Sequence, residues 1–284
     1  MTDPASFILD RDTALQGVGK LPSLPAVVVE LLESMDDDGA GMQQLAAKLS
    51  RDQALVAKVL RVANSSFYGL QGKVDSIADA VVVLGLRGVR TLATAAAVTN
   101  VFASTTSDDY DFRLFWRHSI ATALCAREIA IALRLNEGNA FTAGLLHDIG
   151  RLALASCFPR HFAAVIACRK AGDITWRQAE QQVLGLDHAE LGQMLTERWR
   201  FPVAMSSAIG AHHTPAHAGD PLVAVLHVAD VLAHALDLAG DTSGQVPPID
   251  QSAWELLDMS ENRWHELFAR VESQFASACE TLVS

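Results

Sequence analysis

Histidine and aspartate side chains interrupt apolar segments at five places along the 284-residue chain. In the segment AFTAGLLHDIGRLALASCF, residues 140–158, His147 and Asp148 lie among leucines and an isoleucine. Burying an unpaired carboxylate among such side chains costs several kcal/mol, so some partner must compensate for it. The other four places hold His118 in LFWRHSIATALCA, His188 in LGLDHAELGQML, His212 and His213 in AIGAHHTP, and Asp230 in AVLHVADVLAHAL.

Imidazole and carboxylate groups are ligands of zinc, iron, manganese and nickel, and an aspartate can bridge two ions. Two ions roughly 3.5–4 Å apart can hold a water that attacks a phosphoester. Each place also has an ordinary explanation: a hydrogen-bonded core histidine, a histidine at a helix C-terminus, or an aspartate paired with an arginine. A cluster closed by hydrogen bonds alone is the weaker explanation for all five, because so many histidines would need other polar partners. We therefore predict a divalent metal centre of one ion or two.

Arg151 follows Asp148 by three residues, which places both side chains on the same face of a helix. From there its planar guanidinium could bind a phosphate through two parallel hydrogen bonds. If the chain hydrolyses phosphoesters, Asp148 and Arg151 are the predicted catalytic residues. Arg151 could instead face solvent or form an ion pair with Asp148, and these alternatives stay open at the level of sequence.

Composition argues against several classes of protein. The chain has 22 Lys and Arg against 33 Asp and Glu, a formal net charge of −11, which disfavours nucleic-acid binding over the whole surface. Four cysteines without CxxC spacing argue against a disulfide framework or a thiolate zinc site. The start MTDPASFILDRD lacks the features of a signal peptide, and arginines interrupt the apolar stretch DAVVVLGLRGVRTLATAAAV. We expect a cytoplasmic protein that does not engage a membrane.

Helical periodicity dominates the sequence, whereas aromatic residues make up only 6% and strand-like alternation is weak. These patterns predict an all-α fold. One long helix is expected over residues 109–135, and another over 139–157 that runs through the His-Asp pair. Ser76 is predicted to cap a helix that Gly85 ends. Further helices are expected at 159–171, 175–185, 187–199, 202–213 and 220–239.

A linker separates the last segment of the chain from the rest. Residues 239–250, AGDTSGQVPPID, contain glycine, serine and two prolines, which marks a boundary. Beyond it, apolar residues recur at steps of three and four, as on one face of a helix. This stripe predicts a helix that packs back on the body; a homodimer contact or a connection to another module is the alternative. Its members are Trp264, Leu267, Val271, Phe275, Ala278 and Leu282.

The order H…HD…H…HH…D resembles that of the HD superfamily of metal-dependent phosphohydrolases. The phrase GLLHDIGRLAL is similar to the version shared by HD-GYP phosphodiesterases and HDOD domains. The N-terminal half favours HDOD, because LPSLPAVVVELLESM, LAAKLSRDQALVAKVLRVANSSFYG and VDSIADAVVVLGLRGVRTL resemble the helical opening of HDOD domains. The resemblance implies a compact multi-helix bundle with a helical lead-in at 1–20, an HDOD domain at 21–240 with lobes 21–108 and 109–240, and a linker plus amphipathic helix at 241–284.

HDOD domains resemble degenerate relatives of these hydrolases and serve as output or scaffolding modules in bacterial signalling. The resemblance therefore implies a regulatory module that acts on a signalling protein or a sibling regulatory domain. If the assignment of Asp230 as a metal ligand is wrong, His227, three residues before it, is the substitute ligand. The resemblance assigns metal ligation to seven retained residues: His118, His147, Asp148, His188, His212, His213 and Asp230.

Three departures weaken the resemblance to the HD-GYP phosphodiesterases. Arg151 replaces the lysine expected three residues after Asp148, and Leu114 replaces a glutamate that could hold a third ion. The segment TPAHAGDP after His213 has no GYP loop. The regulatory module is therefore the preferred function, and an active phosphohydrolase on a nucleotide or cyclic dinucleotide is the alternative.

Overall fold

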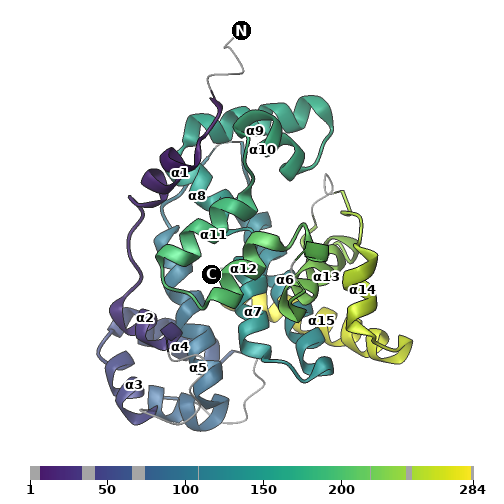
Figure 1. The fold of residues 1–284 in the computed structure, drawn as a ribbon. Helices are drawn as coiled ribbons and strands as arrows, with labels where there is room; N and C mark the ends of the chain where they lie inside the picture. Colours follow the sequence, from purple (N-terminus) through teal and green to yellow (C-terminus); the bar gives the residue numbers. More distant parts are fainter. Residues whose placement is uncertain are drawn as a thin grey trace.

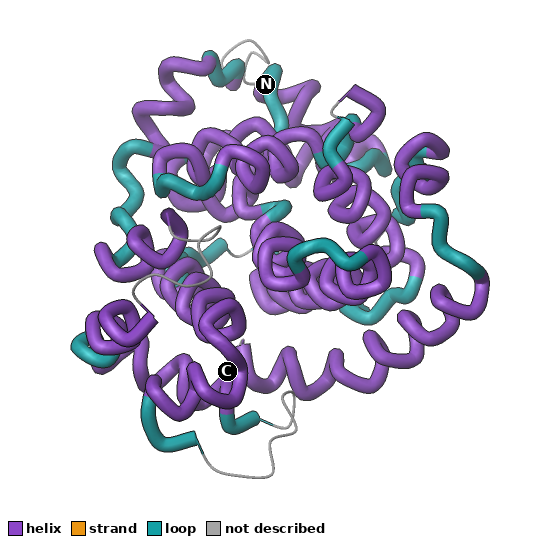
Figure 2. The backbone as a smooth tube through the Cα atoms, turned by 60° about the horizontal axis from the view of Figure 1, so that its bottom comes forward, coloured by secondary structure: helices purple, strands orange, loops and turns teal. Residues whose placement is uncertain are grey.

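The computed structural model describes residues 7–33, 42–65, 74–107, 109–217, 219–240 and 245–282. Within these ranges the regular structure is helical and no strand occurs, which confirms the all-α prediction (Figure 2). Buried apolar side chains from the first described helix to the last form one continuous core. The N-terminal helices therefore share that core with the helices that carry the candidate ligands.

Polar capping residues begin many of the helices. Asp10, Asp52, Asp111 and Asp220 each accept a backbone N–H of the first turn, which satisfies a donor that has no partner inside the helix. In chain order the helices are α1 (Arg11–Val18), α2 (Ala26–Glu33), α3 (Met42–Leu49), α4 (Gln53–Ala63), α5 (Ile77–Val101), α6 (Phe112–Leu133), α7 (Glu137–Leu146), α8 (Ile149–Cys157), α9 (Pro159–Gly172), α10 (Trp176–Leu184), α11 (His188–Arg198), α12 (Val203–Ala211), η2 (Pro215–His217), α13 (Pro221–Ala235), α14 (Gln251–Leu257) and α15 (Glu261–Leu282) (Figure 1).

Helix α6 is a core helix that packs against α7, α13 and α15 (Figure 1). Its middle turns, from Ile120 to Ala126, are buried at every residue, as expected of a helix that is apolar on all sides. His118 lies just before this stretch and is itself buried. The first candidate ligand is thus held on a helix that its neighbours fix from several directions.

Helix α5 contacts α2, α3, α4 and α7, and so joins the N-terminal helices to the rest. Gly85 lies inside it at φ 71° and ψ 167°, a conformation that favours glycine and kinks the helix. Ser76 caps the helix and Gly85 ends its first segment, as predicted; a second helical segment follows directly after this kink and continues to Val101. Helix α5 is long and apolar enough to cross a membrane, yet 56% of its apolar window is buried inside the protein.

The prediction of a single helix over 139–157 is wrong, because two helices meet within it. Helix α7 ends at Leu146 and α8 begins at Ile149, so His147 and Asp148 occupy the turn between them. Inside a helix, the side chains of consecutive residues point about 100° apart. Residues in a turn are free of this restriction. The break lets both side chains approach the same interior region.

The C-terminal apolar stripe is an internal contact. Helix α15 packs against α6, and the ring of Trp264 stacks on Trp254 of α14 with centroids 4.5 Å apart. Leu282, the last member of the predicted stripe, is half-buried. The side chains that α15 buries are Trp264, Leu267, Val271, Phe275, Ala278 and Cys279.

Candidate metal centre

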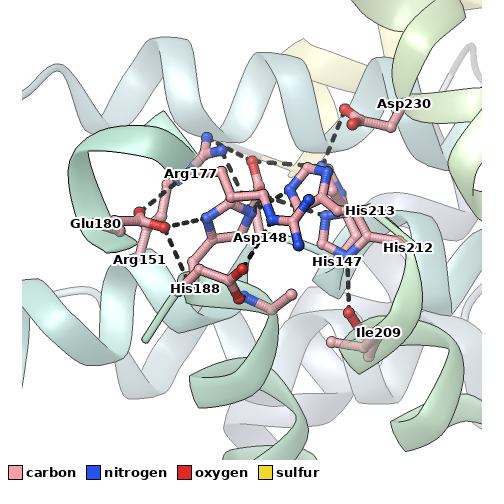
Figure 3. Close-up of polar contacts among 12 residues, drawn as sticks. His147, Asp148, Arg151, Arg177, Glu180, His188, Ile209, His212, His213 and Asp230 are labelled. Atoms are coloured by element: carbon pink, nitrogen blue, oxygen red, sulfur yellow. Dashed lines mark hydrogen bonds and ion pairs between the residues drawn. The ribbon is translucent and has the colours of Figure 1, made fainter. Parts of the chain in front are cut away.

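All seven predicted ligands come together in one interior region of the protein. Figure 3 labels each of them except His118. They are supplied by α6, the α7–α8 turn, the start of α11, the residues after α12, and α13. All but one are buried; the exception, His213, is half-buried. We call this set the His/Asp cluster: His118, His147, Asp148, His188, His212, His213 and Asp230.

Backbone carbonyls hold the Nδ1 atoms of His147 and His212. His147 donates Nδ1–H to the carbonyl of Gly144 at 2.7 Å. His212 donates Nδ1–H to the carbonyl of Ile209 at 2.7 Å (Figure 3). Each acceptor lies in the last turn of a helix, where carbonyls have no partner within the helix. Because a carbonyl oxygen only accepts, Nδ1 carries a proton, and Nε2 is the ring nitrogen that faces the cluster.

Glu180 holds His188 in the same way. Its Oε2 accepts from Nδ1 of His188 at 2.5 Å and from the backbone N–H of His188 at 2.9 Å. Glu180 lies on α10 and is fully buried. A carboxylate behind an imidazole fixes the orientation of the ring and strengthens Nε2 as a metal ligand.

Asp148 lies between two groups of imidazoles. It occupies the N-cap position of α8, but its carboxylate makes no capping hydrogen bond there. Oδ1 is 2.9 Å from Nε2 of His188 and 4.0 Å from Nε2 of His212. Oδ2 is 3.4 Å from Nε2 of His147 and 3.9 Å from Nε2 of His118. A carboxylate with donor atoms around both oxygens has the arrangement of a bridging ligand.

Asp230 is the second carboxylate of the cluster. Its Oδ1 lies 3.0 Å from Nε2 of His118 and 3.4 Å from Nε2 of His147. The two Nε2 atoms of these histidines are 3.3 Å apart, and Nε2 of His213 lies 2.9 Å from Nε2 of His188. Lone-pair atoms this close repel each other unless a proton or a cation lies between them.

The donor atoms fit a divalent metal. Four triads can be drawn from the cluster and His234, and within each triad the three ligand atoms lie within 4.8 Å of one another. The buried Nε2 of His212 has no hydrogen-bond partner among the described residues, and such buried polar atoms are uncommon. Imidazole nitrogens with carboxylate oxygens suit zinc, iron, manganese and nickel. The triads are His188–His212–His213, His118–His147–Asp148, His118–Asp230–His234 and His147–His212–Asp230.

Charges within the cluster influence one another strongly. Burial opposes the charge on His147, but the carboxylates of Asp148 and Asp230 together outweigh it and raise the pKa of His147 to about 10. Burial also opposes the charge on His188, but the carboxylates of Glu180 and Asp148 together raise the pKa of His188 to about 9. Burial lowers the pKa of His212 to about 3. A divalent cation would replace the protons on His147 and His188 as the positive partner of the carboxylates.

Arg151 forms the ion pair that sequence reasoning held as an alternative to phosphate binding. Its Nη1 lies 2.6 Å from Oδ2 of Asp148, and its guanidinium lies over the ring of Trp176. Burial raises the pKa of Asp148, but Arg151 and His147 hold it well below its ordinary value. In this structure Arg151 therefore stabilises the ionised form of Asp148.

A cleft of about 730 Å³ opens beside the cluster. His118, Arg151, His213 and Asp230 line it, so a molecule in the cleft would reach the cluster directly. Basic side chains of α9 and α10 and aspartates at 109, 111 and 237 line other parts of its wall. The cleft is therefore polar and mixed in charge, in a chain that is acidic as a whole.

Sequence reasoning missed two residues of this site, Glu180 and His234. His234 lies one turn after Asp230 on α13, with its Nε2 3.6 Å from Oδ1 of Asp230, and burial lowers its pKa to about 4. The i,i+4 spacing from Asp230 is a signal that could have identified His234. Nothing in WRQAEQQVL distinguishes Glu180 from its exposed neighbours.

His227, the substitute ligand considered from sequence, has both ring nitrogens engaged by backbone groups. Its Nδ1 donates to the carbonyl of His212 at 2.8 Å, and its Nε2 accepts the backbone N–H of Asp250 at 2.8 Å. A ring held in this way has no lone pair left for a metal. His227 instead supports the segment that carries His212.

Comparison with known proteins gives the same family by sequence and by structure. A family profile described as the HDOD domain matches residues 21–215. A solved HDOD domain protein of unknown function from Geobacter sulfurreducens is 26% identical with a TM-score of 0.82, covering 96% of this chain and 99% of that one. A Shewanella amazonensis protein, described provisionally as a phosphohydrolase, is 29% identical with a TM-score of 0.76 and coverages of 95% and 97%.

Two longer proteins match as well. A Marinobacter aquaeolei protein, described provisionally as a signal transduction protein, is 25% identical with a TM-score of 0.78, over 99% of this chain and 69% of that one. This chain spans about half the length of the curated relative it matches, an uncharacterized Treponema pallidum protein that is 26% identical over 290 residues, 100% of this chain and 52% of that protein. Since the profile covers well over half of its residues, this chain belongs to the HDOD domain family.

Proposed function

We propose that this chain is an HDOD regulatory module whose core holds a divalent metal centre, and that it transmits a signal through contact with another protein. One observation carries the metal part of the proposal. His147, His188 and His212 each have Nδ1 bonded to an acceptor, and all three Nε2 atoms face Asp148. Three rings in one tautomer around a carboxylate match the way proteins prepare imidazoles for a metal.

Two ions account for the arrangement better than one. One donor group consists of histidines only and faces Oδ1 of Asp148. The other includes Asp230 and faces Oδ2 of Asp148. Positive charge at both positions would offset the cost of burying two carboxylates. Zinc, iron, manganese and nickel all accept this donor set.

The proposed partner is a signalling protein or a sibling regulatory domain in the cytoplasm. The Treponema pallidum relative and the Marinobacter aquaeolei protein both extend beyond the part that matches this chain. In those two proteins, the region similar to this chain is therefore joined to additional sequence. The stripe on α15 is buried against α6. A homodimer would therefore have to use another surface.

Elemental analysis of protein purified without chelator tests the metal centre. We expect one to two equivalents of metal in the wild type and a clear loss in His147→Ala and Asp148→Ala. The matched control is His265→Ala, because His265 is an exposed histidine on α15 and should leave the metal content unchanged. Sub-stoichiometric metal in gently purified wild-type protein would contradict the proposal.

A metal-dependent phosphohydrolase is the second candidate, and the cleft beside the cluster favours it, because His118, Arg151 and Asp230 line its wall. A divalent ion would supply Lewis acidity toward a phosphoryl oxygen. To bind the phosphate of a nucleotide or cyclic dinucleotide, Arg151 would have to leave its ion pair with Asp148. Assays of phosphodiester and nucleotide substrates with Mn²⁺ or Fe²⁺ test this candidate. Turnover that disappears in Asp148→Ala would rule out a purely regulatory role.

A further inference from the structure

His234 lies on the side of the His/Asp cluster that faces the cleft. It lines the cleft together with His118 and Asp230, and its side chain is 23% exposed, whereas that of His147 is 0% exposed. Its ring centroid is 4.3 Å from that of His118, and its Nε2 is 3.6 Å from Oδ1 of Asp230. The three ligand atoms of His118, Asp230 and His234 lie within 4.8 Å of one another.

We propose that His234 is a further ligand of the ion held by His118 and Asp230, and that it closes the coordination position facing the cleft. The proposal rests on the metal centre of the proposed function. His234 would be a ligand in addition to the seven that the family resemblance assigns, and it would cover the side of the ion that faces the cleft.

The backbone places His234 for this role. Residues four apart on a helix have their side chains on one face, so Asp230 and His234 of α13 project in the same direction. Neighbouring donor atoms around an ion with bonds of about 2.0–2.2 Å are about 3 Å apart. The spacings of 3.0 Å between His118 and Asp230 and 3.6 Å between His234 and Asp230 need little adjustment to reach that geometry.

Comparison with His227 on the same helix makes the role specific. The backbone groups of His212 and Asp250 engage both ring nitrogens of His227, which therefore serves the scaffold. The Nε2 of His234 instead lies beside Asp230, a member of the cluster. Of the two histidines of α13, His234 is the one with a ring nitrogen directed at the candidate ion.

A ligand at this position has a consequence for function. Catalytic metal sites keep a position open to water or substrate, whereas structural sites are closed by protein ligands. With His234 bound, the ion would not be open to a phosphate in the cleft. An ion closed by His234 suits a regulatory centre. If His234 left the ion, the freed position could bind an anion.

The test uses the full chain loaded with Co²⁺, whose visible absorption reports the number and kind of its ligands. Wild type is compared with His234→Ala, with His234→Gln as a variant of similar size, and with His265→Ala as a control histidine far from the cluster. We expect both His234 variants to change the absorption spectrum and to bind Co²⁺ about tenfold or more weakly. Circular dichroism checks that each variant is folded.

Inorganic phosphate provides the second readout. Phosphate should change the Co²⁺ spectrum of His234→Ala at concentrations that leave wild type and His265→Ala unchanged, because only the variant has an open position. Identical spectra and identical phosphate responses in wild type and both His234 variants would overturn the role of His234 while leaving the metal centre intact. Failure of wild type to bind Co²⁺ at all would instead overturn the metal centre and the inference with it.

Discussion

His147 and His212 make the same hydrogen bond at the C-terminal ends of two different helices. Each donates Nδ1–H to the carbonyl three residues earlier, at 2.7 Å in both cases, and the ring centroids are 5.2 Å apart at an interplanar angle of 88°. Each bond satisfies a carbonyl that the helix leaves unpaired and also orients an imidazole. The same local chemistry in two distant segments thus directs two Nε2 atoms to one region.

Removal of the metal should destabilise the protein, because a ligand that binds only the native state stabilises it by mass action. With free metal at about a hundred times Kd, this contribution is about 2.7 kcal/mol. At about 2–4 °C per kcal/mol, chelation should lower the Tm of wild type by about 5–10 °C. Differential scanning calorimetry measures the shift. His147→Ala should melt at nearly the same temperature with and without chelator, and an equal response in both proteins would contradict the link between metal and core.

Glu180→Gln should weaken metal binding although Glu180 is not itself a proposed ligand. The substitution keeps the size of the side chain but removes the charge that holds Nδ1 of His188. Loss of such a supporting carboxylate typically lowers metal affinity by about 10–100-fold. Competition with a chromogenic chelator measures the affinity. Glu197→Gln, an exposed change on α11, is the control, and equal affinities in the two variants would show that Glu180 has no such role.

Gly150→Ala should disturb the contact between α8 and α11. A Cβ atom at residue 150 would lie 2.0 Å from the carbonyl oxygen of His188 and 2.8 Å from the amide nitrogen of Gly192. Both are backbone atoms and cannot rotate away, so the helices must separate, at a cost of about 1–3 kcal/mol. Thermal unfolding should show the loss of stability, and metal affinity should fall because Asp148 and His188 move apart.

Gly172→Ala is the matched control for that change. A Cβ at residue 172 would touch only the side chain of Ile174, at 3.4 Å or more, so the Tm should change little. If Gly150→Ala kept both the Tm and the metal affinity of Gly172→Ala, the close helix contact would not position the site.

Asp250 should make stability depend on pH below the neutral range. Its carboxylate accepts from Ser252 and from the backbone N–H of Ala253, and these hydrogen bonds lower its pKa below the ordinary value of 3.8. A lowered pKa means that the ionised form stabilises the folded state at pH values above 3.8, and that this contribution is lost as the pH falls through the folded-state pKa. The Tm difference between wild type and Asp250→Ala should therefore be constant near neutrality and shrink in acid.

Asp250→Asn separates the cap from the charge. Asparagine also caps helices, so this variant should stay close to wild type near pH 7. A Tm difference for Asp250→Ala that does not narrow at low pH would show that the ionised cap is not the source of the effect.

The meeting of the seven predicted ligands could be anticipated because each is a polar residue within an apolar segment of the sequence, where burial without a partner is costly. The turn between α7 and α8 was harder to predict. Asp148 is a residue type that begins helices, but the apolar pattern continues through it on both sides. Tertiary packing, including the close approach of α8 and α11 at Gly150, favours the break over a continuous helix.

Glu180 and Gly85 show two other limits of sequence reasoning. A glutamate among glutamines and an arginine on α10 is the composition of a solvated face, and only the position of α10 against His188 makes Glu180 buried. Gly85 breaks the helical dihedrals as predicted, but a second helical segment follows it directly and runs to Val101, and the whole of α5 contacts α2, α3, α4 and α7. In both cases the long-range contacts decide what the local pattern leaves open.

The most direct test of the metal centre is anomalous X-ray diffraction from crystals of the metal-loaded protein, recorded at the absorption edge of the bound metal. We expect anomalous peaks within bonding distance of the Nε2 atoms of His147, His188 and His212, on either side of the Asp148 carboxylate. Well-occupied metal at another place in the molecule, or no peak among these atoms in fully loaded crystals, would contradict the proposed centre.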